Sequence, residues 1–499
     1  MTSLVIVYHR QPLEELTTNG KVEYREHRSP NGIIPTLRGF FERVDDACWV
    51  AWTRSSGKLG DSTTSTTVRI HGERCDYQVV RVRLSAEEIS QFYHITSKEA
   101  LWPVINSFPS HYATYNTRWT TFREVNRRFA AAACEAASPG AVVWVHDYNL
   151  WLVPGFIRRL RPDLRIAFFH HTAFPAPDLF AMLPWRNEIL DSLLACDQIG
   201  FHIPRYARNF CQLVEALRDD VEIEDAPVPR WMGATGQALS ERRMPISVKV
   251  GSRRIHIDSL PIAVPADYIG EVASRPEVQQ RSTQIVGDLG GGTRILSVGR
   301  VDYVKGIRQQ LETYTRLLER RKDLHGRVRL LLVAAAAADG MTVYKAAQRE
   351  IEQLVGHING KFGRIDWSPI TLSTRPMPFE EVVAAYCATE IAWITPLRDG
   401  MNLVAKEYVA ARVDGDGLLV LSEFAGAAVE LPEAILTNPY SLIQMDEAIE
   451  RAIDMSEAER RRRMASMRQH VLQYDAAFWA STVLERFASL ADWDVSLKT

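Results

Sequence analysis

Short hydrophobic runs alternate along most of the chain with amphipathic segments of helical period. Short apolar runs bounded by polar sequence suit buried strands, and in the first half they are Leu4–Tyr8, Cys48–Trp52, Val142–Val145, Ile166–Phe169 and Ile199–Phe201. The segment Leu150–Leu160, which has helical spacing, lies between two of these runs. Strands separated by helices predict βαβ units and a parallel sheet.

The same alternation begins again near residue 293. The second series of strand-like runs is Ile295–Val298, Val328–Ala334, Ile391–Thr395, Leu418–Leu421 and Ile435–Asn438. We therefore predict an α/β chain with two doubly wound domains, one over residues 1–260 and one over 266–477, joined by Pro261–Pro265. The last apolar segment predicts a closing helix within 478–499 that packs back on the first domain.

Two segments late in the first half are interpreted separately. Asp219–Gly236 is polar and contains Pro227 and Pro229, so it is predicted to be a surface loop. Ile246–Val250 and Arg253–Ile257 alternate around the dipeptide Gly-Ser, which predicts a hairpin.

Composition excludes several classes of function. The 499 residues are 46% hydrophobic and 24% charged, as in average soluble proteins, and the net charge of −2 provides no basic field for nucleic acid or an anionic membrane. No apolar stretch reaches the ~18 residues of a membrane span, and the chain begins without a secretory signal pattern, so we expect a cytoplasmic protein. Six scattered cysteines without a C-x-x-C pair predict reduced thiols.

The first candidate for chemistry is the segment Thr395–Glu407, which reads as the end of a strand, a tight loop and a helix. Asn402 can cap that helix, whose N-terminus would present unpaired N–H groups to a phosphate. Asp399 in the loop and Glu407 in the helix can accept hydrogen bonds from hydroxyls. Phosphate and hydroxyls together indicate a nucleotide sugar. The alternative is an ordinary loop with solvated charges, and the segment alone does not separate the two.

The second candidate follows the strand Ile295–Val298. Arg300 and Lys305 lie five residues apart on a predicted strand-to-helix loop, where they can grip two phosphates, and Gly306 permits close backbone approach. The segment is not a Walker loop, since the chain has no G-x-x-x-x-G-K-[ST].

These motifs resemble the trehalose-phosphate synthase family. The donor site of that family is similar to R-x-D-Y-x-K-G at 300–306, T-P-L-R-D-G-M-N-L-V-A-K-E at 395–407 and E-F-A-G at 423–426, and its N-terminal domain is similar to L-W-P at 101–103, H-D-Y at 146–148 and F-F-H-H at 168–171. The likeness covers nearly the whole chain. It implies a retaining, metal-independent glycosyltransferase with two facing Rossmann-like domains (GT-B type), an active site in the cleft between them, and no cofactor.

The resemblance also implies a role for each matching residue. Arg300 and Lys305 would neutralise the leaving diphosphate, His171 would lie against the donor sugar, and Asp147 would contact the acceptor side. The donor-binding residues would be Asn31, Gly32, Asp399, Gly400, Met401, Asn402, Leu403 and Glu407. The acceptor's phosphate would be surrounded by Arg10, Tyr93 and Trp102, beside Asp147. No residue is expected to bind a metal, because adjacent histidines on a strand point to opposite faces.

Three further segments resemble one branch of the family most closely: Tyr8–Arg10, Ser29–Ile33 and Tyr93–Glu99. Members of this branch transfer glucose from ADP-glucose to glycerol 3-phosphate, making the phosphorylated precursor of a compatible solute. In trehalose-phosphate synthases, an arginine after the second strand of the C-terminal domain binds the phosphate of glucose 6-phosphate. Residues 334–341 contain no basic residue, so glycerol 3-phosphate is the expected acceptor.

Several alternatives stay open. A trehalose-phosphate synthase and an inactive regulatory homologue that binds sugar phosphates are the other functions considered. The donor base, ADP or UDP, is not decided by any residue we can name. We expect neither nucleic acid nor a membrane as partner, and a separate phosphatase to act on the product. A homo-oligomer is compatible with the sequence, which does not fix the oligomeric state.

Overall fold

A computed structural model of the chain describes residues 2–18, 21–26, 32–55, 65–72, 75–233, 236–336 and 342–490. Asn31 and most of the 334–341 loop lie outside these ranges. The chain forms two compact units. The N-terminal unit comprises Met1–Val228, Glu241–Ile262 and Trp479–Thr499, and the C-terminal unit comprises Pro229–Ser240 and Ala263–Phe478. In this division residues 229–240 belong with the C-terminal unit, and the predicted linker 261–265 is shared between the two units.

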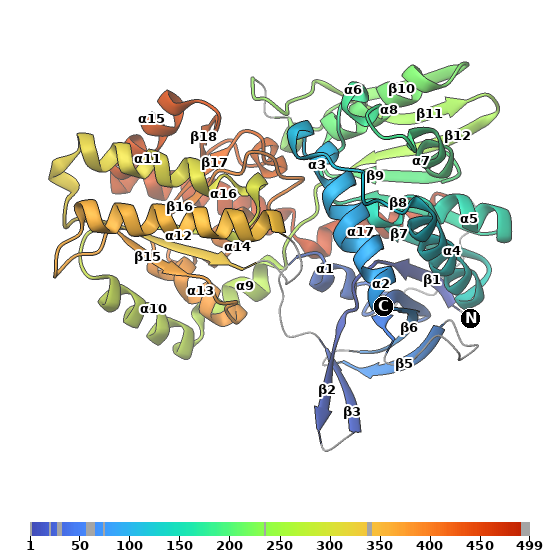
Figure 1. Cartoon of the computed structure of the whole chain (residues 1–499), viewed down its shortest axis with the longest axis horizontal. Coiled ribbons are helices and arrows are strands. Elements are labelled where there is room, and N and C mark those ends of the chain that lie inside the picture. Colours follow the sequence, from blue (N-terminus) through green and yellow to red (C-terminus); the bar gives the residue numbers. More distant parts are fainter. Residues whose placement is uncertain are drawn as a thin grey trace. The chain divides into compact units, whose positions relative to one another are not determined.

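The N-terminal unit is built on one large sheet, which is ten-stranded within the described ranges, in the order β10-β11-β12-β9-β8-β7-β1-β4-β6-β5 (Figure 1). Its strands are β1 (Thr2–Val7), β4 (Ala47–Arg54), β5 (Ser65–His71), β6 (Asp76–Leu84), β7 (Ala137–His146), β8 (Arg165–His170), β9 (Gln198–Phe201), β10 (Val221–Pro227), β11 (Arg243–Val250) and β12 (Arg253–Ser259). From β12 through β6 the pairings are parallel. The predicted parallel sheet is thereby confirmed.

Helices connect these strands. They are α1 (Ile34–Arg38), α2 (Ala86–Ile89), α3 (Trp102–Ile105), α4 (Trp119–Ala136), α5 (Val153–Leu160), α6 (Pro177–Phe180), α7 (Arg186–Leu193) and α8 (Pro204–Leu217). A separate hairpin, β2 (Leu13–Thr18) with β3 (Lys21–Glu26), extends from the unit.

The surface loop predicted over Asp219–Gly236 is wrong for part of that segment. Val221–Pro227 is strand β10, which pairs antiparallel with β11 at the edge of the sheet. The polar composition misled the prediction because an edge strand can carry charges on its exposed side, and Glu222 forms an ion pair with Lys249 (2.7 Å). The hairpin of β11 and β12 is confirmed.

An unusual helix precedes α3. Residues Ser90–Leu101 form a π-helix, η1, in which the N–H group of Trp102 donates to the carbonyl of Ser97, five residues earlier. π-Helical geometry is rare, is generally confined to single turns, and is frequent at functional sites. The sequence analysis did not predict this element.

The C-terminal unit has a second sheet in the order β15-β14-β13-β16-β17-β18, parallel throughout. Its strands are β13 (Thr293–Arg300), β14 (Val328–Ala335), β15 (Ile370–Ser373), β16 (Ile391–Ile394), β17 (Leu418–Ser422) and β18 (Ile435–Thr437). Its helices are α9 (Ala266–Ser274), α10 (Pro276–Leu289), α11 (Ile307–Arg320), α12 (Thr342–Phe362), α13 (Phe379–Ala388), α14 (Leu403–Ala411), α15 (Leu442–Ile453) and α16 (Glu457–Gln473).

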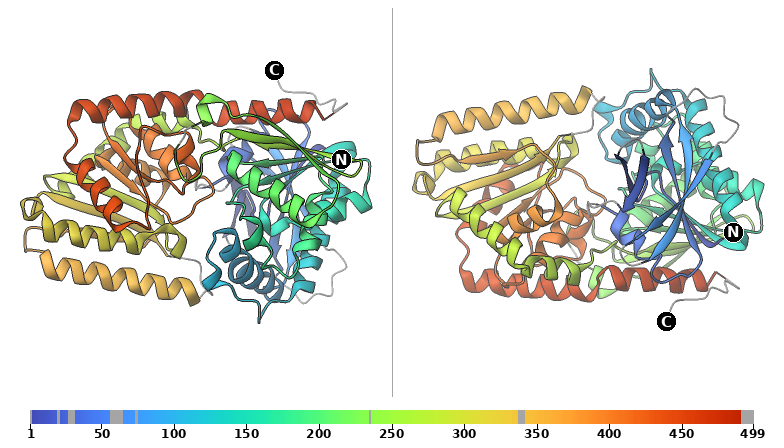
Figure 2. Two further views of the ribbon diagram at one scale, coloured as in Figure 1. Left: turned by 90° about the horizontal axis from the view of Figure 1, so that it is seen from above. Right: turned by 90° about the horizontal axis from the view of Figure 1, so that it is seen from below.

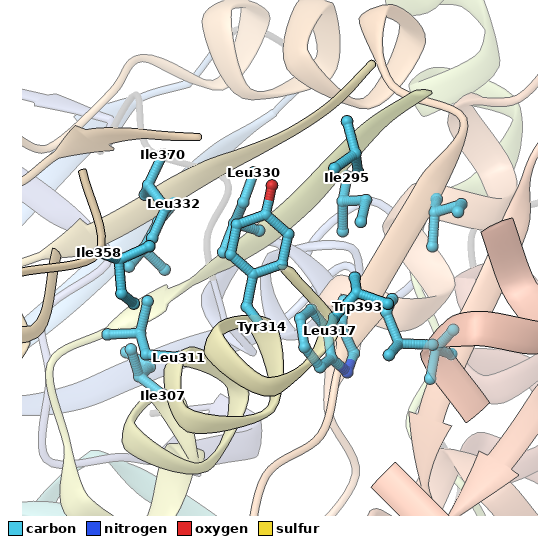
Figure 3. Packing of buried hydrophobic residues seen from close by; sticks show 14 of the residues in the cluster. Ile295, Ile307, Leu311, Tyr314, Leu317, Leu330, Leu332, Ile358, Ile370 and Trp393 are labelled. Atoms are coloured by element: carbon cyan, nitrogen blue, oxygen red, sulfur yellow. The ribbon is translucent and has the colours of Figure 1, made fainter. Parts of the chain in front are cut away.

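Helices cover both faces of this second sheet, with α11 and α12 on one side and α16 on the other (Figure 2). Burial on both faces explains why its strands are continuous apolar runs instead of alternating ones. The core on the α11 side joins Ile295 and Leu330 of the strands to Leu311, Tyr314 and Leu317 of α11 (Figure 3).

The chain then returns to the N-terminal unit along α17 (Ala476–Ala488). Trp479 is fully buried there, with its ring 5.7 Å from that of Trp144 and 5.8 Å from that of Phe40. The predicted closing helix therefore completes the aromatic core of the first unit.

The described residues contain neither a membrane-spanning helix nor a disulfide bond. Within those ranges no helix combines the length and the apolar character needed to span a bilayer. All six cysteines lie in described segments and all are free thiols.

Candidate active site

The donor-side residues of the C-terminal unit lie at the carboxyl ends of β13 and β16, which are neighbours in the sheet. This is the edge where parallel α/β sheets bind ligands. The two loops touch directly, because Leu397 N–H donates to the carbonyl of Val304 (2.8 Å). Gly306 has φ +70°, and a Cβ there would meet the Thr395 carbonyl at 2.3 Å. Only glycine permits this approach.

Lys305, Asp399 and Asn402 form one hydrogen-bonded group. Lys305 Nζ lies 2.6 Å from Asp399 Oδ2, and Asn402 Nδ2 donates to the same oxygen (3.0 Å). The side-chain oxygen of Asn402 accepts from Ala405 N–H (3.1 Å), which confirms the predicted cap of α14. The ammonium group and the helix N-terminus thus converge at one point, which suits an anion.

A third loop, after β17, supports the first two. Asp399 N–H donates to the carbonyl of Phe424 (3.2 Å), and Ala427 N–H donates to that of Met401 (2.8 Å). A Cβ on Gly426 would meet the Gly400 carbonyl at 2.2 Å. The E-F-A-G motif therefore acts by packing against the loop that contains Asp399, and Met401 is buried beneath it.

Glu407 lies inside α14, 5% exposed, and its Oε2 accepts a hydrogen bond from Tyr386 Oη (2.9 Å). Burial raises its pKa from 4.5 to about 7, and the Tyr386 hydrogen bond offsets this only in part. Next to it, Lys406 Nζ lies 2.6 Å from Glu430 Oε2 in an ion pair that is almost completely buried. Sequence reasoning missed this pair, since nothing in the pattern marks a lysine as buried.

A cavity opens at the same strand ends. It is lined by Ser297, Val298, Gly299, Lys305, Ile307, Gln310, Trp393, Ile394, Thr395, Pro396 and Asn402. Arg300 is the last residue of β13 and is exposed, while Leu403 begins α14. Gln310, also missed by the sequence analysis, is a buried polar residue in this lining.

In the N-terminal unit, Asp147 follows β7 in a strained conformation, with φ 70° and ψ 164°, a region that is essentially reserved for glycine. Burial raises its pKa to about 6, although the backbone N–H groups of Tyr148 and His171 donate to the carboxylate. Backbone strain of this kind is concentrated at functional sites.

The histidines divide between two faces as predicted. His171 Nε2 lies 2.9 Å from His146 Nδ1, and His202 Nε2 lies 3.1 Å from the His171 carbonyl. His170 instead stacks on Trp151. Burial lowers the pKa of His146, His170 and His171, so these imidazoles are neutral at pH 7. Among the residues that the structure describes, no group of three His, Cys, Asp or Glu side chains could hold a metal ion.

The residues assigned to the acceptor lie together. Arg10 Nη2 donates to Tyr93 Oη (3.3 Å), and Trp49 Nε1 donates to the Arg10 carbonyl (3.0 Å). Trp102 lies 5.9 Å from the ring of Tyr148, the residue after Asp147. Of the two residues predicted to bind the donor from the N-terminal unit, Gly32 has φ +85° and open space around its Cβ position. The other, Asn31, lies outside the described residues.

Two Rossmann-like units, with a phosphate-suited set of loops in the second, are the architecture of glycosyltransferases of the GT-B type. The solved structure described as trehalose-6-phosphate from E. coli bound with UDP-2-fluoro glucose superposes with a TM-score of 0.82 at 26% identity, over 99% of this chain and all of that one. The model of Glycosyltransferase family 20 matches residues 2–489. The chain belongs to this family.

Curated relatives refine the likeness. The glucosylglycerol-phosphate synthase of Synechocystis sp. is 48% identical over 97% of this chain and 97% of its own length. The trehalose-6-phosphate synthase of Mycolicibacterium gilvum is 38% identical over 97% of this chain and 93% of its own. The chain is thus more similar to the first of these proteins than to the second.

Proposed function

We propose that the protein is a retaining glucosyltransferase that moves glucose from ADP-glucose to glycerol 3-phosphate, giving 2-O-glucosylglycerol phosphate and ADP. The observation that carries this proposal is the 48% identity, across 97% of both chains, with a protein named glucosylglycerol-phosphate synthase. The product would be the precursor of a compatible solute made under salt stress, and a separate phosphatase would release the free solute.

The donor-side geometry supports the proposal. Arg300 is the last residue of β13, and Lys305 lies in the loop that joins β13 to α11, so both cations lie at the same strand end, where the diphosphate would bind. Negative charge grows on that group as it departs, and fixed cations stabilise it in the transition state. Asp399 would accept hydrogen bonds from the glucose hydroxyls, and Glu407 from the ribose hydroxyls.

Retention follows if the acceptor hydroxyl attacks from the face that the diphosphate leaves. The C1–O bond to the diphosphate breaks, the new C1–O bond forms on the same face, and a departing phosphate oxygen takes the hydroxyl proton. No protein nucleophile is needed. Asp147 and His171 would position the acceptor and the sugar, and neither metal nor cofactor takes part.

The acceptor is assigned from the distribution of cations. Residues 334–341 contain no basic residue, so a phosphate bound there would lack a charge-assisted contact. Arg10, held by Tyr93 in the N-terminal unit, instead favours a short phosphate ester.

The test is release of nucleoside diphosphate by the purified protein. ADP-glucose and UDP-glucose are each offered with glycerol 3-phosphate and with glucose 6-phosphate, with and without a chelator. We expect release with ADP-glucose and glycerol 3-phosphate, unaffected by chelation. Release only with glucose 6-phosphate would make the protein a trehalose-phosphate synthase. No release with any pair would favour a regulatory homologue.

Variants of Arg300 and Lys305 test whether this activity depends on the proposed diphosphate-binding residues. Arg300→Ala or Lys305→Ala should remove at least 99% of turnover, since loss of one transition-state contact of this kind costs about 10²–10³-fold. Arg308→Ala is the matched control, because Arg308 is 57% exposed and pairs with Glu312 on the surface. Full activity in both site variants would remove the diphosphate assignment.

A further inference from the structure

The π-helix η1 brings an unassigned lysine to the acceptor side. Bonds from i to i+5 set residues five apart on successive turns, and Tyr93 and Lys98 have this spacing. Lys98 Nζ lies 3.8 Å from the ring centroid of Trp102 and 5.9 Å from that of Tyr93. The ammonium group therefore lies between the two aromatic residues already assigned to the acceptor.

A second cation, Arg10, contacts Tyr93 from outside the π-helix. Arg10, just beyond β1, donates to the hydroxyl of Tyr93, whose ring is stacked on His9 (5.6 Å between centroids). Burial, followed by the charges of Arg10 and Lys98, lowers the pKa of His9, so this imidazole is neutral. Lys98 also acts electrostatically on Asp147: burial raises the pKa of that carboxyl to about 6 and the Lys98 charge lowers it, so the carboxylate is largely ionised at pH 7. Two cations from different elements, Arg10 and Lys98, therefore lie against Tyr93.

We propose that Lys98 is a specificity-determining residue that binds the acceptor's phosphate together with Arg10. The inference rests on the proposed function, which supplies a phosphate-bearing acceptor. A phosphate monoester has a charge of −1.5 to −2 at pH 7 and is best matched by two cations. Arg10 presents a fork and Lys98 a point charge, and the cation–π contact with Trp102 holds the lysine in place.

The same assignment explains how the acceptor's phosphate could be bound although residues 334–341 contain no basic residue. Arg10, Tyr93, Lys98 and Trp102 all lie in the N-terminal unit, so the phosphate would be bound there by side chains of that unit alone. An acceptor with few atoms between its phosphate and its reactive hydroxyl fits this arrangement, and glycerol 3-phosphate is such an acceptor.

The experiment compares Lys98→Met, which keeps the length but loses the charge, with Lys98→Arg, which keeps the charge. In Lys98→Met the KM for glycerol 3-phosphate should rise at least tenfold, the range lost with a hydrogen bond to a charged group. The donor KM should be unchanged and kcat should stay within about threefold. Lys98→Arg should recover most of the loss. Lys249→Met is the control, since Lys249 lies on the distant strand β11, where it pairs with Glu222 of β10.

Other outcomes separate this inference from a packing role and from the proposed function. An unchanged acceptor KM in Lys98→Met, or equal losses in the Met and Arg variants, would overturn it. If the wild type accepts only glucose 6-phosphate, the proposed function fails, and Lys98 is then judged by the KM for that acceptor. If Lys98→Met does not fold, Lys98→Gln replaces it. Thermal stabilisation by inorganic phosphate, lost in the Met variant and retained in the Arg variant, would support the inference independently.

Discussion

A single buried carboxyl, that of Glu407, should make donor binding depend on pH if it binds the ribose as proposed. Its pKa of about 7 means that the carboxylate, the form that would accept two strong hydrogen bonds from a ribose, becomes the main form only as the pH rises through that value. We expect the donor KM to fall about fivefold between pH 6 and pH 8, the difference between charged and neutral hydrogen bonds. Glu407→Gln should flatten this profile, and an equally steep profile in the variant would contradict the assignment.

A rise in pH, which should strengthen donor binding through Glu407, should weaken the folded state through the same carboxyl. Because the folded-state pKa lies above the unfolded value of 4.5, the folded state binds more protons between pH 4.5 and 7. The free energy of unfolding must therefore decrease as the pH rises through that window, by up to about 3 kcal/mol from this group. The difference between wild type and Glu407→Gln, measured by urea unfolding at pH 5 and pH 7.5, isolates this contribution from other titrating groups.

At the scale of elements, Gln310 joins α11 to two strands. Its amide nitrogen donates to the Trp393 carbonyl (2.8 Å) and to Thr395 Oγ1 (3.0 Å), and its oxygen accepts from Ser297 Oγ (2.8 Å). Gln310→Leu would leave these partners buried without a bond, which costs about 1–3 kcal/mol for each group. We expect a loss of about 3 kcal/mol in urea unfolding and a higher donor KM. Gln309→Leu, one position along the helix and half-buried, should change neither.

The segment around Asp399 shows why some elements could be predicted. Its strand, turn, cap and helix are each specified by local residue types, so β16, Asn402 and α14 occur where the sequence indicated. Gln310 and the Lys406–Glu430 pair could not be found in this way, because a polar residue in a helix is normally solvated and only tertiary packing buries it. The π-helix escaped for a different reason. Hydrophobic patterns in a sequence are compared with the period of 2 residues of a strand and of 3.6 residues of an α-helix, and the i to i+5 spacing of a π-helix matches neither.

At the scale of the whole molecule, the N-terminal unit depends on the far end of the described chain. Trp479 contributes to its core, with Nε1 donating to the carbonyl of Leu260 (3.4 Å). Trp479→Ala should cost about 3–5 kcal/mol and lower the melting temperature by roughly 10 °C. Glu485→Ala, on the exposed side of the same helix, should have no measurable effect. A melting temperature unchanged by Trp479→Ala would show that α17 is dispensable for this core.

This route of the chain has a consequence for biosynthesis. Residues 263–478, which belong to the other unit, emerge from the ribosome before Trp479 does. At about 5–20 residues per second that interval lasts roughly 10 to 40 s, during which the nascent N-terminal unit exposes the aromatic surface that Trp479 will cover. The unit that begins first should therefore be completed last, and the growing chain offers a binding surface for chaperones throughout that interval.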